Sequence, residues 1–236
     1  MTNKLGLHIL AFAYGLTVCA CSFNVVAPPA RLAFAESPKV TKAGKTKYSA
    51  EWMGGGKIIG PEIQAATLRV SKGLSENREV NFRPIIGMVN KDNRLHQNNT
   101  FYGMALDLKN QVNPSEDWWA ASFWGGGGFL YSSFGDIYSG HGGFAIGEES
   151  HWIRPFISTD IFIDIPARTK PILGHNEESV LVKRLTTTVG VKAAVGLKLQ
   201  FIPNLALVSA ASLGTASSKT DNIGYFLIGQ SFELEF

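Results

Sequence analysis

Serine, histidine and acidic side chains gather in one stretch of this chain. They are Ser139, His141, Glu148, Glu149 and His151. A hydroxyl, an imidazole and a carboxylate are the groups that nucleophilic acyl transfer uses. Their spacing matches no catalytic motif, and mixed polar residues are common in loops. We therefore keep Ser139, His141 and His151 as candidate catalytic residues, and we favour a protein that is not an enzyme.

Glycines crowd the same part of the chain, and a glycine-rich loop can cradle a phosphate group. Gly125–Gly128 are consecutive, and more glycines follow up to Gly147. No Gly-Lys-Ser/Thr completes a phosphate-binding loop, and no alternation of strand and helix surrounds the glycines. We interpret Gly125–Ser150 as a region of sharp bends or a loop. A short amphipathic helix over Ser115–Trp124 is an alternative to a strand at its start.

Charged residues recur at alternate positions of several apolar segments. In Trp152–Ile165, isoleucines alternate with Arg154, Asp160 and Asp164. Alternate residues of a strand share a face, so these charges lie together. The full set is Arg69, Arg83, Asp107, Arg154, Asp160, Asp164, Lys192 and Lys198. Inside a closed barrel they would conduct ions, orient a substrate or pair with one another; we favour pairing, because buried charge needs a partner.

The same alternation defines a series of candidate strands, many near the length that a tilted transmembrane strand needs. They are Ile63–Ser71, Glu79–Val89, Thr100–Lys109, Trp118–Tyr131, Trp152–Ile165, Leu185–Phe201, Leu205–Gly214 and Asn222–Phe236. Tyr48–Trp52 reads as a short strand or edge segment. We expect an all-β fold over residues 48–236, a closed antiparallel transmembrane β-barrel of about eight strands.

The N-terminus has the features of a signal peptide. Lys4 precedes an apolar run over Leu5–Ala27, and Ala33-Phe34-Ala35 offers a small-x-small cleavage site. We predict a signal peptide over residues 1–35, cleaved after Ala35; lipidation at Cys21 is the alternative. Residues 36–47, which carry four lysines, are predicted to form a flexible periplasmic tail.

Composition excludes several classes of function. Both cysteines precede Ala35, so cleavage there would leave no thiol for disulfides, zinc or nucleophilic catalysis. The chain has 22 Lys and Arg against 19 Asp and Glu, and this near balance argues against a nucleic-acid partner. The sequence indicates no metal and no cofactor.

The connections between strands predict which end of the barrel faces the cell exterior. With the C-terminus in the periplasm, the tight turn Phe201–Asn204 lies inside and Ala167–Val180 lies outside. The same count puts the polar loops Lys72–Arg78 and Asn110–Asp117 outside. It leaves Asn90–Asn99 and Ser132–Ser150 on the periplasmic side, although both are long for periplasmic turns.

The last strand ends on an aromatic residue, with Phe232, Leu234 and Phe236 on one face. This ending resembles the closing strand of Gram-negative outer-membrane β-barrels, which the barrel-assembly machinery reads. With the leader and the strands, the chain looks like the small barrels of the OmpA/OmpX and PagL type. The resemblance implies an integral outer-membrane protein that contacts lipid and lipopolysaccharide. Its loops would meet an extracellular surface partner.

The resemblance leaves several functions open. The lipid A deacylases of this architecture carry His-x-Ser-Asn on a late strand, whereas the comparable stretch Leu207–Ser212 has no histidine. We favour a non-enzymatic barrel with a structural or surface-interaction role, or a narrow pore. One alternative is an acyl hydrolase of lipid A or phospholipid that uses His141 and His151. Another is a soluble periplasmic barrel that binds an apolar ligand.

Overall fold

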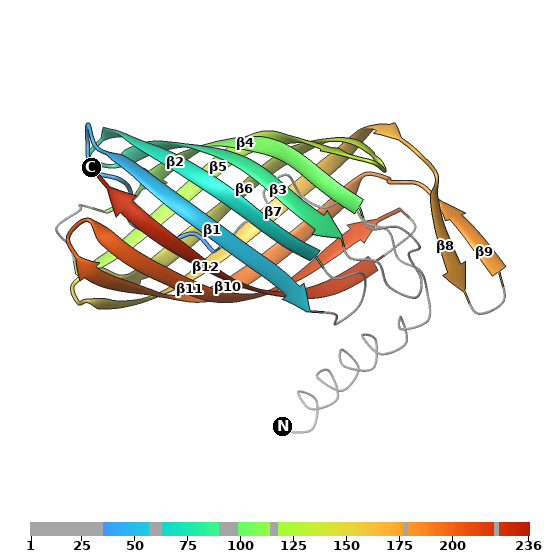
Figure 1. The fold of residues 1–236 in the computed structure, drawn as a ribbon. Helices are drawn as coiled ribbons and strands as arrows, with labels where there is room; N and C mark the ends of the chain where they lie inside the picture. The colour runs from blue at the N-terminus through green and yellow to red at the C-terminus, as the bar shows by residue number, and fades with distance from the viewer. Residues whose placement is uncertain (1–34, 57–62, 90–98, 114–117, 177–178, 220–221) are drawn as a thin grey trace, which may run out of the picture.

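The computed structural model describes residues 35–56, 63–89, 99–113, 118–176, 179–219 and 222–236. This part of the chain forms β-strands only, and it contains no helix that could cross a membrane. The strands are β1 (Thr46–Gly56), β2 (Ile63–Ser75), β3 (Arg78–Val89), β4 (Asn99–Gln111), β5 (Trp119–Ser132), β6 (Gly135–Glu148), β7 (Ile153–Thr169), β8 (Ile172–Asn176), β9 (Ser179–Lys183), β10 (Thr188–Ile202), β11 (Leu205–Ser218) and β12 (Asn222–Glu235). Ten of them close into one antiparallel barrel, and β8 and β9 form a separate hairpin (Figure 1). The predicted closed antiparallel β-barrel is confirmed.

The two ends of the barrel differ. One end holds Phe236, the β2–β3 turn and the β10–β11 turn, and we call it the C-terminal end. The β8–β9 hairpin projects beyond the opposite end, which we call the hairpin end (Figure 1). Because neighbouring strands are antiparallel, successive connections alternate between these two ends.

The prediction of about eight strands was wrong, because the barrel has ten. The alternation of apolar and polar residues predicts only a short segment over Tyr48–Trp52. In the structure, β1 is a full strand that pairs with both β2 and β12. The same alternation predicts a connection over Ser132–Ser150, most of which is β6. Glycines in β1 and β6 leave little side-chain alternation to read. The alternative helix over Ser115–Trp124 was also wrong, since β5 already begins at Trp119.

The unrecognised β6 inverts the predicted end of every connection before it. The β2–β3 and β4–β5 connections were predicted outside, yet they lie at the C-terminal end together with Phe201–Asn204. The β3–β4 connection lies at the hairpin end, although Asn90–Asn99 was predicted to be periplasmic. Residues 90–98 themselves are outside the described part. The connections that follow β6, Ala167–Val180 and Phe201–Asn204, lie at opposite ends of the barrel, as the count predicts.

The outer face of the barrel is apolar. In β7, Ile157 and Ile161 are 57% and 62% exposed, whereas the side chains that alternate with them are buried. Aromatic rings flank this apolar band at both ends. The pairs in contact are Tyr48 with Phe236 at the C-terminal end, and Tyr102 with Tyr131 and Phe129 with Tyr138 at the hairpin end. An apolar band between two aromatic girdles is the outer surface of a transmembrane barrel.

Inside the barrel, aromatic rings lie over glycines of the adjacent strand. A Cβ atom at Gly190 would lie 2.1 Å from the ring of Phe162, and one at Gly196 would lie 2.2 Å from the ring of Phe156. Each ring is directly opposite its glycine in the strand register. Similar pairs are Gly87 with Phe101, Gly143 with Trp124, and Gly214 with Tyr225. The missing side chain of each glycine leaves the space that the opposing ring occupies.

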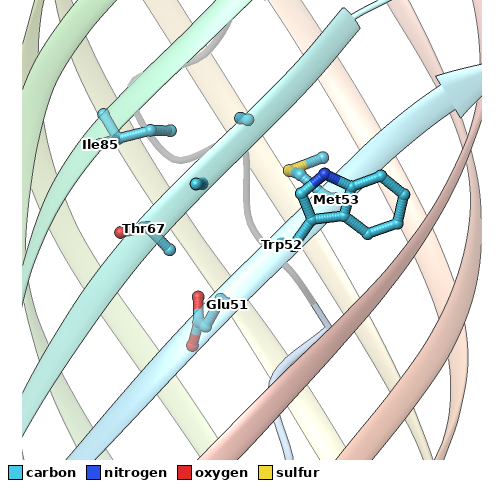
Figure 2. Close-up of a pocket in the computed structure, with 7 residues that line it drawn as sticks. Glu51, Trp52, Met53, Thr67 and Ile85 are labelled. Carbon is cyan, nitrogen blue, oxygen red and sulfur yellow. The ribbon is translucent and has the colours of Figure 1, made fainter.

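An apolar cluster fills the hairpin half of the lumen. Its buried members come from β1 to β6, from β12 and from the connection between β7 and β10. They are Met53, Ala65, Ile85, Phe101, Leu130, Ile137, Ile172, Leu185 and Leu227. Figure 2 shows the edge of this cluster, where Met53 and Ile85 lie near Glu51 and Thr67. The small gap that they line has no room for a water molecule.

Candidate functional site: the filled lumen

The N-terminal segment, residues 35–41, occupies the lumen. The sequence predicts residues 36–47 to be a flexible periplasmic tail, yet Glu36, Ser37 and Thr41 are buried. Ala35 packs against Phe156 in an apolar contact inside the barrel. The interior of an eight-stranded barrel is just wide enough for its own side chains. Ten strands enclose more space, and the N-terminal segment fills part of it.

The barrel wall binds the backbone of the N-terminal segment. The amide of Val40 donates to Gln111 Oε1 at 3.2 Å, and the amide of Thr41 donates to Glu79 Oε2 at 2.6 Å. Lys109 Nζ donates to two carbonyl oxygens of the segment, at 2.7 and 2.9 Å. The segment is therefore held in place by hydrogen bonds as well as by packing.

Arg69 in β2 is the centre of the charged lumen. Its guanidinium group lies 2.7 Å from a carboxylate oxygen of Glu36, 2.9 Å from one of Glu51 and 2.8 Å from one of Glu233. All four side chains are at most 3% exposed. One arginine thus connects the N-terminal segment, β1 and β12, across the seam where the first and last strands pair.

Arg83 in β3 extends this arrangement around the barrel. It forms ion pairs with Glu36 and with Asp107, the latter at 3.0 Å between Nε and Oδ2. Asp107 also contacts the ring of His141 in β6 through Nε2. The lumen thus holds one connected set, which we call the central network: Glu36, Glu51, Arg69, Glu79, Arg83, Asp107, Lys109, His141, Lys198 and Glu233.

The remaining charges predicted for the lumen form smaller groups. Asp160 pairs with Lys192 at 3.0 Å and accepts a hydrogen bond from Trp124 Nε1. Arg154 pairs with Glu149 at 2.9 Å near the C-terminal end. The structure therefore unites Arg69, Arg83, Asp107 and Lys198, and it places Asp160 with Lys192 and Arg154 with Glu149 in separate pairs.

Asp164 differs from every other buried acid in the described part of the chain. Each of the others has a basic side chain within 4.0 Å, whereas Asp164 accepts a hydrogen bond from Ser139 Oγ and has no basic neighbour at that distance. Asp164 is fully buried, and its Oδ2 atom has no hydrogen-bond partner. The carboxyl group is therefore the least compensated acid of the lumen.

The candidate catalytic residues do not form one constellation. Ser139 and His141 both point into the lumen from β6, but Ser139 donates to Asp164 while His141 contacts Asp107. His151 lies in the exposed turn after β6, where it contacts Glu148 and Ser150. Ser150 and Glu148 both contact the same ring atom of His151, Nδ1, so the acid does not hold one nitrogen while the other faces the serine. None of these contacts therefore forms a chain in which a base could activate Ser139.

Several residues of the central network were missed by the sequence pattern. Glu51, Lys109 and Glu233 share the charged face of their strands, so their phase could have identified them. Glu36 lies before the first strand, where no periodicity exists, and no pattern signals its position. Within the described residues, no group of three or more His, Cys, Asp and Glu side chains could hold a metal ion.

The predicted assembly residues lie on the outer face at the C-terminal end. Phe232 and Phe236 are 59% and 61% exposed, and Leu234 between them is 38% exposed. The predicted signal peptide ends at Ala35. Residues 1–34, which include Cys21, are outside the part of the chain that the structure describes. Cleavage after Ala35 and lipidation at Cys21 both stay predictions.

Comparison with known proteins finds similarity of structure only. No family model and no curated protein matches the sequence. The N-terminal β-barrel domain of Pseudomonas aeruginosa OprF is 13% identical, over 82% of this chain and 98% of that domain, with a TM-score of 0.37. The outer-membrane protease OmpT of Escherichia coli is 6% identical, over 85% and 99%, with a TM-score of 0.47. An outer-membrane channel of Pseudomonas putida F1 is 9% identical, over 86% and 100%, with a TM-score of 0.48.

Proposed function

We propose that this protein is an integral outer-membrane β-barrel that is not an enzyme and whose lumen is closed. The observation that carries the proposal is the filling of both halves of the lumen. The central network and the N-terminal segment occupy the C-terminal half, and the apolar cluster occupies the hairpin half. A barrel filled in this way acts through its outer wall and its ends, so we favour a surface role over a narrow pore.

The hairpin end is the proposed surface of interaction. If the C-terminus faces the periplasm, the β8–β9 hairpin lies outside the cell. A two-stranded sheet that projects from the barrel has unpaired edges, which another chain could extend. The apolar wall would contact lipid and lipopolysaccharide. Phe232, Leu234 and Phe236 would be read by the barrel-assembly machinery.

The two alternative functions have less support. An acyl hydrolase based on Ser139, His141 and His151 lacks the connected geometry that serine activation needs. A soluble periplasmic barrel would expose the apolar band between the aromatic girdles to water, and so large an apolar surface is rare on soluble monomers. An altered mass spectrum of lipid A in cells that contain the protein would nevertheless favour the hydrolase.

Trypsin added to intact cells tests the proposed orientation. Arg184 is exposed beside the hairpin, whereas Arg78 is exposed at the C-terminal end. We expect cleavage after Arg184 in intact cells, and cleavage after Arg78 only once the outer membrane has been permeabilised. Mass spectrometry of the fragments identifies each site. Cleavage at Arg78 in intact cells with Arg184 protected would reverse the orientation.

Electrical recording tests the closed lumen. We expect the purified protein to insert into planar lipid bilayers without discrete current steps in concentrated KCl, because side chains of the described residues fill both halves of the barrel. Insertion is verified independently by heat-modifiable migration of protein recovered from lipid vesicles. A reproducible open channel of constant conductance would contradict the proposal and favour the narrow pore.

A further inference from the structure

The carboxylate of Glu36 is bound as a ligand would be. Oε1 lies 2.7 Å from Arg69 Nη1 and 3.4 Å from Lys109 Nζ, and Oε2 contacts Arg83 Nη2. The three basic side chains come from β2, β3 and β4, and each is at most 4% exposed. Three converging buried cations around one carboxylate form a complete anion-binding site.

This carboxylate is the member of the central network that no strand supplies. Every other acid of the network is fixed by the barrel wall, whereas Glu36 enters the lumen on a segment that precedes β1. The wall binds that segment by its backbone, through Gln111, Glu79 and Lys109. The wall thus recognises a carboxylate and an extended peptide.

Removing Glu36 takes away the one acceptor that Arg69, Arg83 and Lys109 share. Arg69 would retain Glu51 and Glu233. Arg83 would retain Asp107, and Lys109 would retain Glu79. The position between the three side chains would then hold no acceptor, and buried donors that lose their acceptor are unfavourable. A small anion that fits the vacated space would therefore bind.

We infer that the inner wall of β2, β3 and β4 is a carboxylate-binding site, occupied within the chain by Glu36 and open to a free carboxylate when that side chain is absent. The ligand class is a small carboxylate, because the site presents a fork of guanidinium and ammonium donors to two oxygens. The same site would accept an external carboxylate whenever the N-terminal segment leaves the lumen.

Chemical rescue of E36A tests the inference. The variant is refolded in detergent micelles in sodium acetate or in sodium chloride at equal ionic strength, and its unfolding by urea is followed by heat-modifiable migration. We expect acetate to stabilise E36A, with a roughly tenfold higher ratio of folded to unfolded protein when acetate is at about ten times its Kd. The wild type, whose site is filled, should respond equally to both salts.

Two control variants separate a specific site from a general salt effect. E36Q fills the same space with a neutral amide, so we expect it to be less stable than the wild type and to gain nothing from acetate. D136A removes an ion pair with the exposed Arg168 at the hairpin end, and it should also show no acetate effect. The inference is overturned if E36A gains nothing from acetate, whether it folds in both salts or in neither. It is equally overturned if E36Q matches the wild type in chloride. The closed-lumen proposal would survive either result.

Discussion

Replacing Arg69 with methionine is expected to destabilise the barrel by about 3–5 kcal/mol, the usual cost of removing one partner from a buried ion pair. Arg69 contacts three buried carboxylates, and the change leaves Glu36, Glu51 and Glu233 without that cation. Methionine keeps much of the side-chain volume, so the loss reports charge and hydrogen bonding more than packing. The free energy of unfolding in lipid vesicles, measured by urea titration, checks the value.

The matched control is Arg168→Met. Arg168 is 84% exposed and pairs with Asp136. Asp136 is buried but the guanidinium group of Arg168 stays hydrated, so we expect this variant to lose clearly less than Arg69→Met, on the order of 1 kcal/mol. Equal losses at Arg69 and Arg168 would mean that the buried contacts of Arg69 contribute nothing beyond a surface pair.

Replacing Gly196 with alanine is expected to cost about 1–3 kcal/mol, as other overpacked cores do. The new methyl group would lie 2.2 Å from the ring of Phe156, a distance at which the ring must move. Phe156 has little room to do so, because it packs against Ala35, Ala194 and Val208 inside the barrel. Urea unfolding in vesicles, as above, measures the change.

Gly125→Ala provides the control on the outer face. A Cβ atom there would meet only a backbone oxygen at 3.8 Å. Alanine in a strand is slightly favoured over glycine, so this variant should equal or exceed the wild type in stability. If both variants behave alike, the ring of Phe156 does not limit the space at Gly196.

The strands that alternate fully between apolar and polar residues could be predicted from the sequence. β7 and β12 carry a bulky side chain at nearly every position, and their burial follows period two. β6 could not, because five of its fourteen residues are glycines and hide the alternation. Because each strand reverses the chain direction, the prediction without β6 assigned every earlier connection to the opposite end of the barrel.

The charged lumen was partly predictable for the same physical reason. Phase alone places Arg69, Arg83 and Asp107 on one face, because period two holds in their strands. Which charges pair depends on the register between neighbouring strands. The amino-acid sequence alone does not specify that register. The position of Glu36 depends on how wide the closed barrel is, which follows only from the number of strands.

The link between Arg69 and Glu233 has a consequence for the order of assembly. These residues are 164 positions apart, so this contact forms only after nearly the entire chain has arrived. A half-inserted sheet would carry Arg69 without one of its three acids, and it would gain little from the charges already in place. Closing so long a loop costs conformational entropy, and the ion pairs that offset this cost form only when the barrel closes. Insertion should therefore be slow and close to all-or-none.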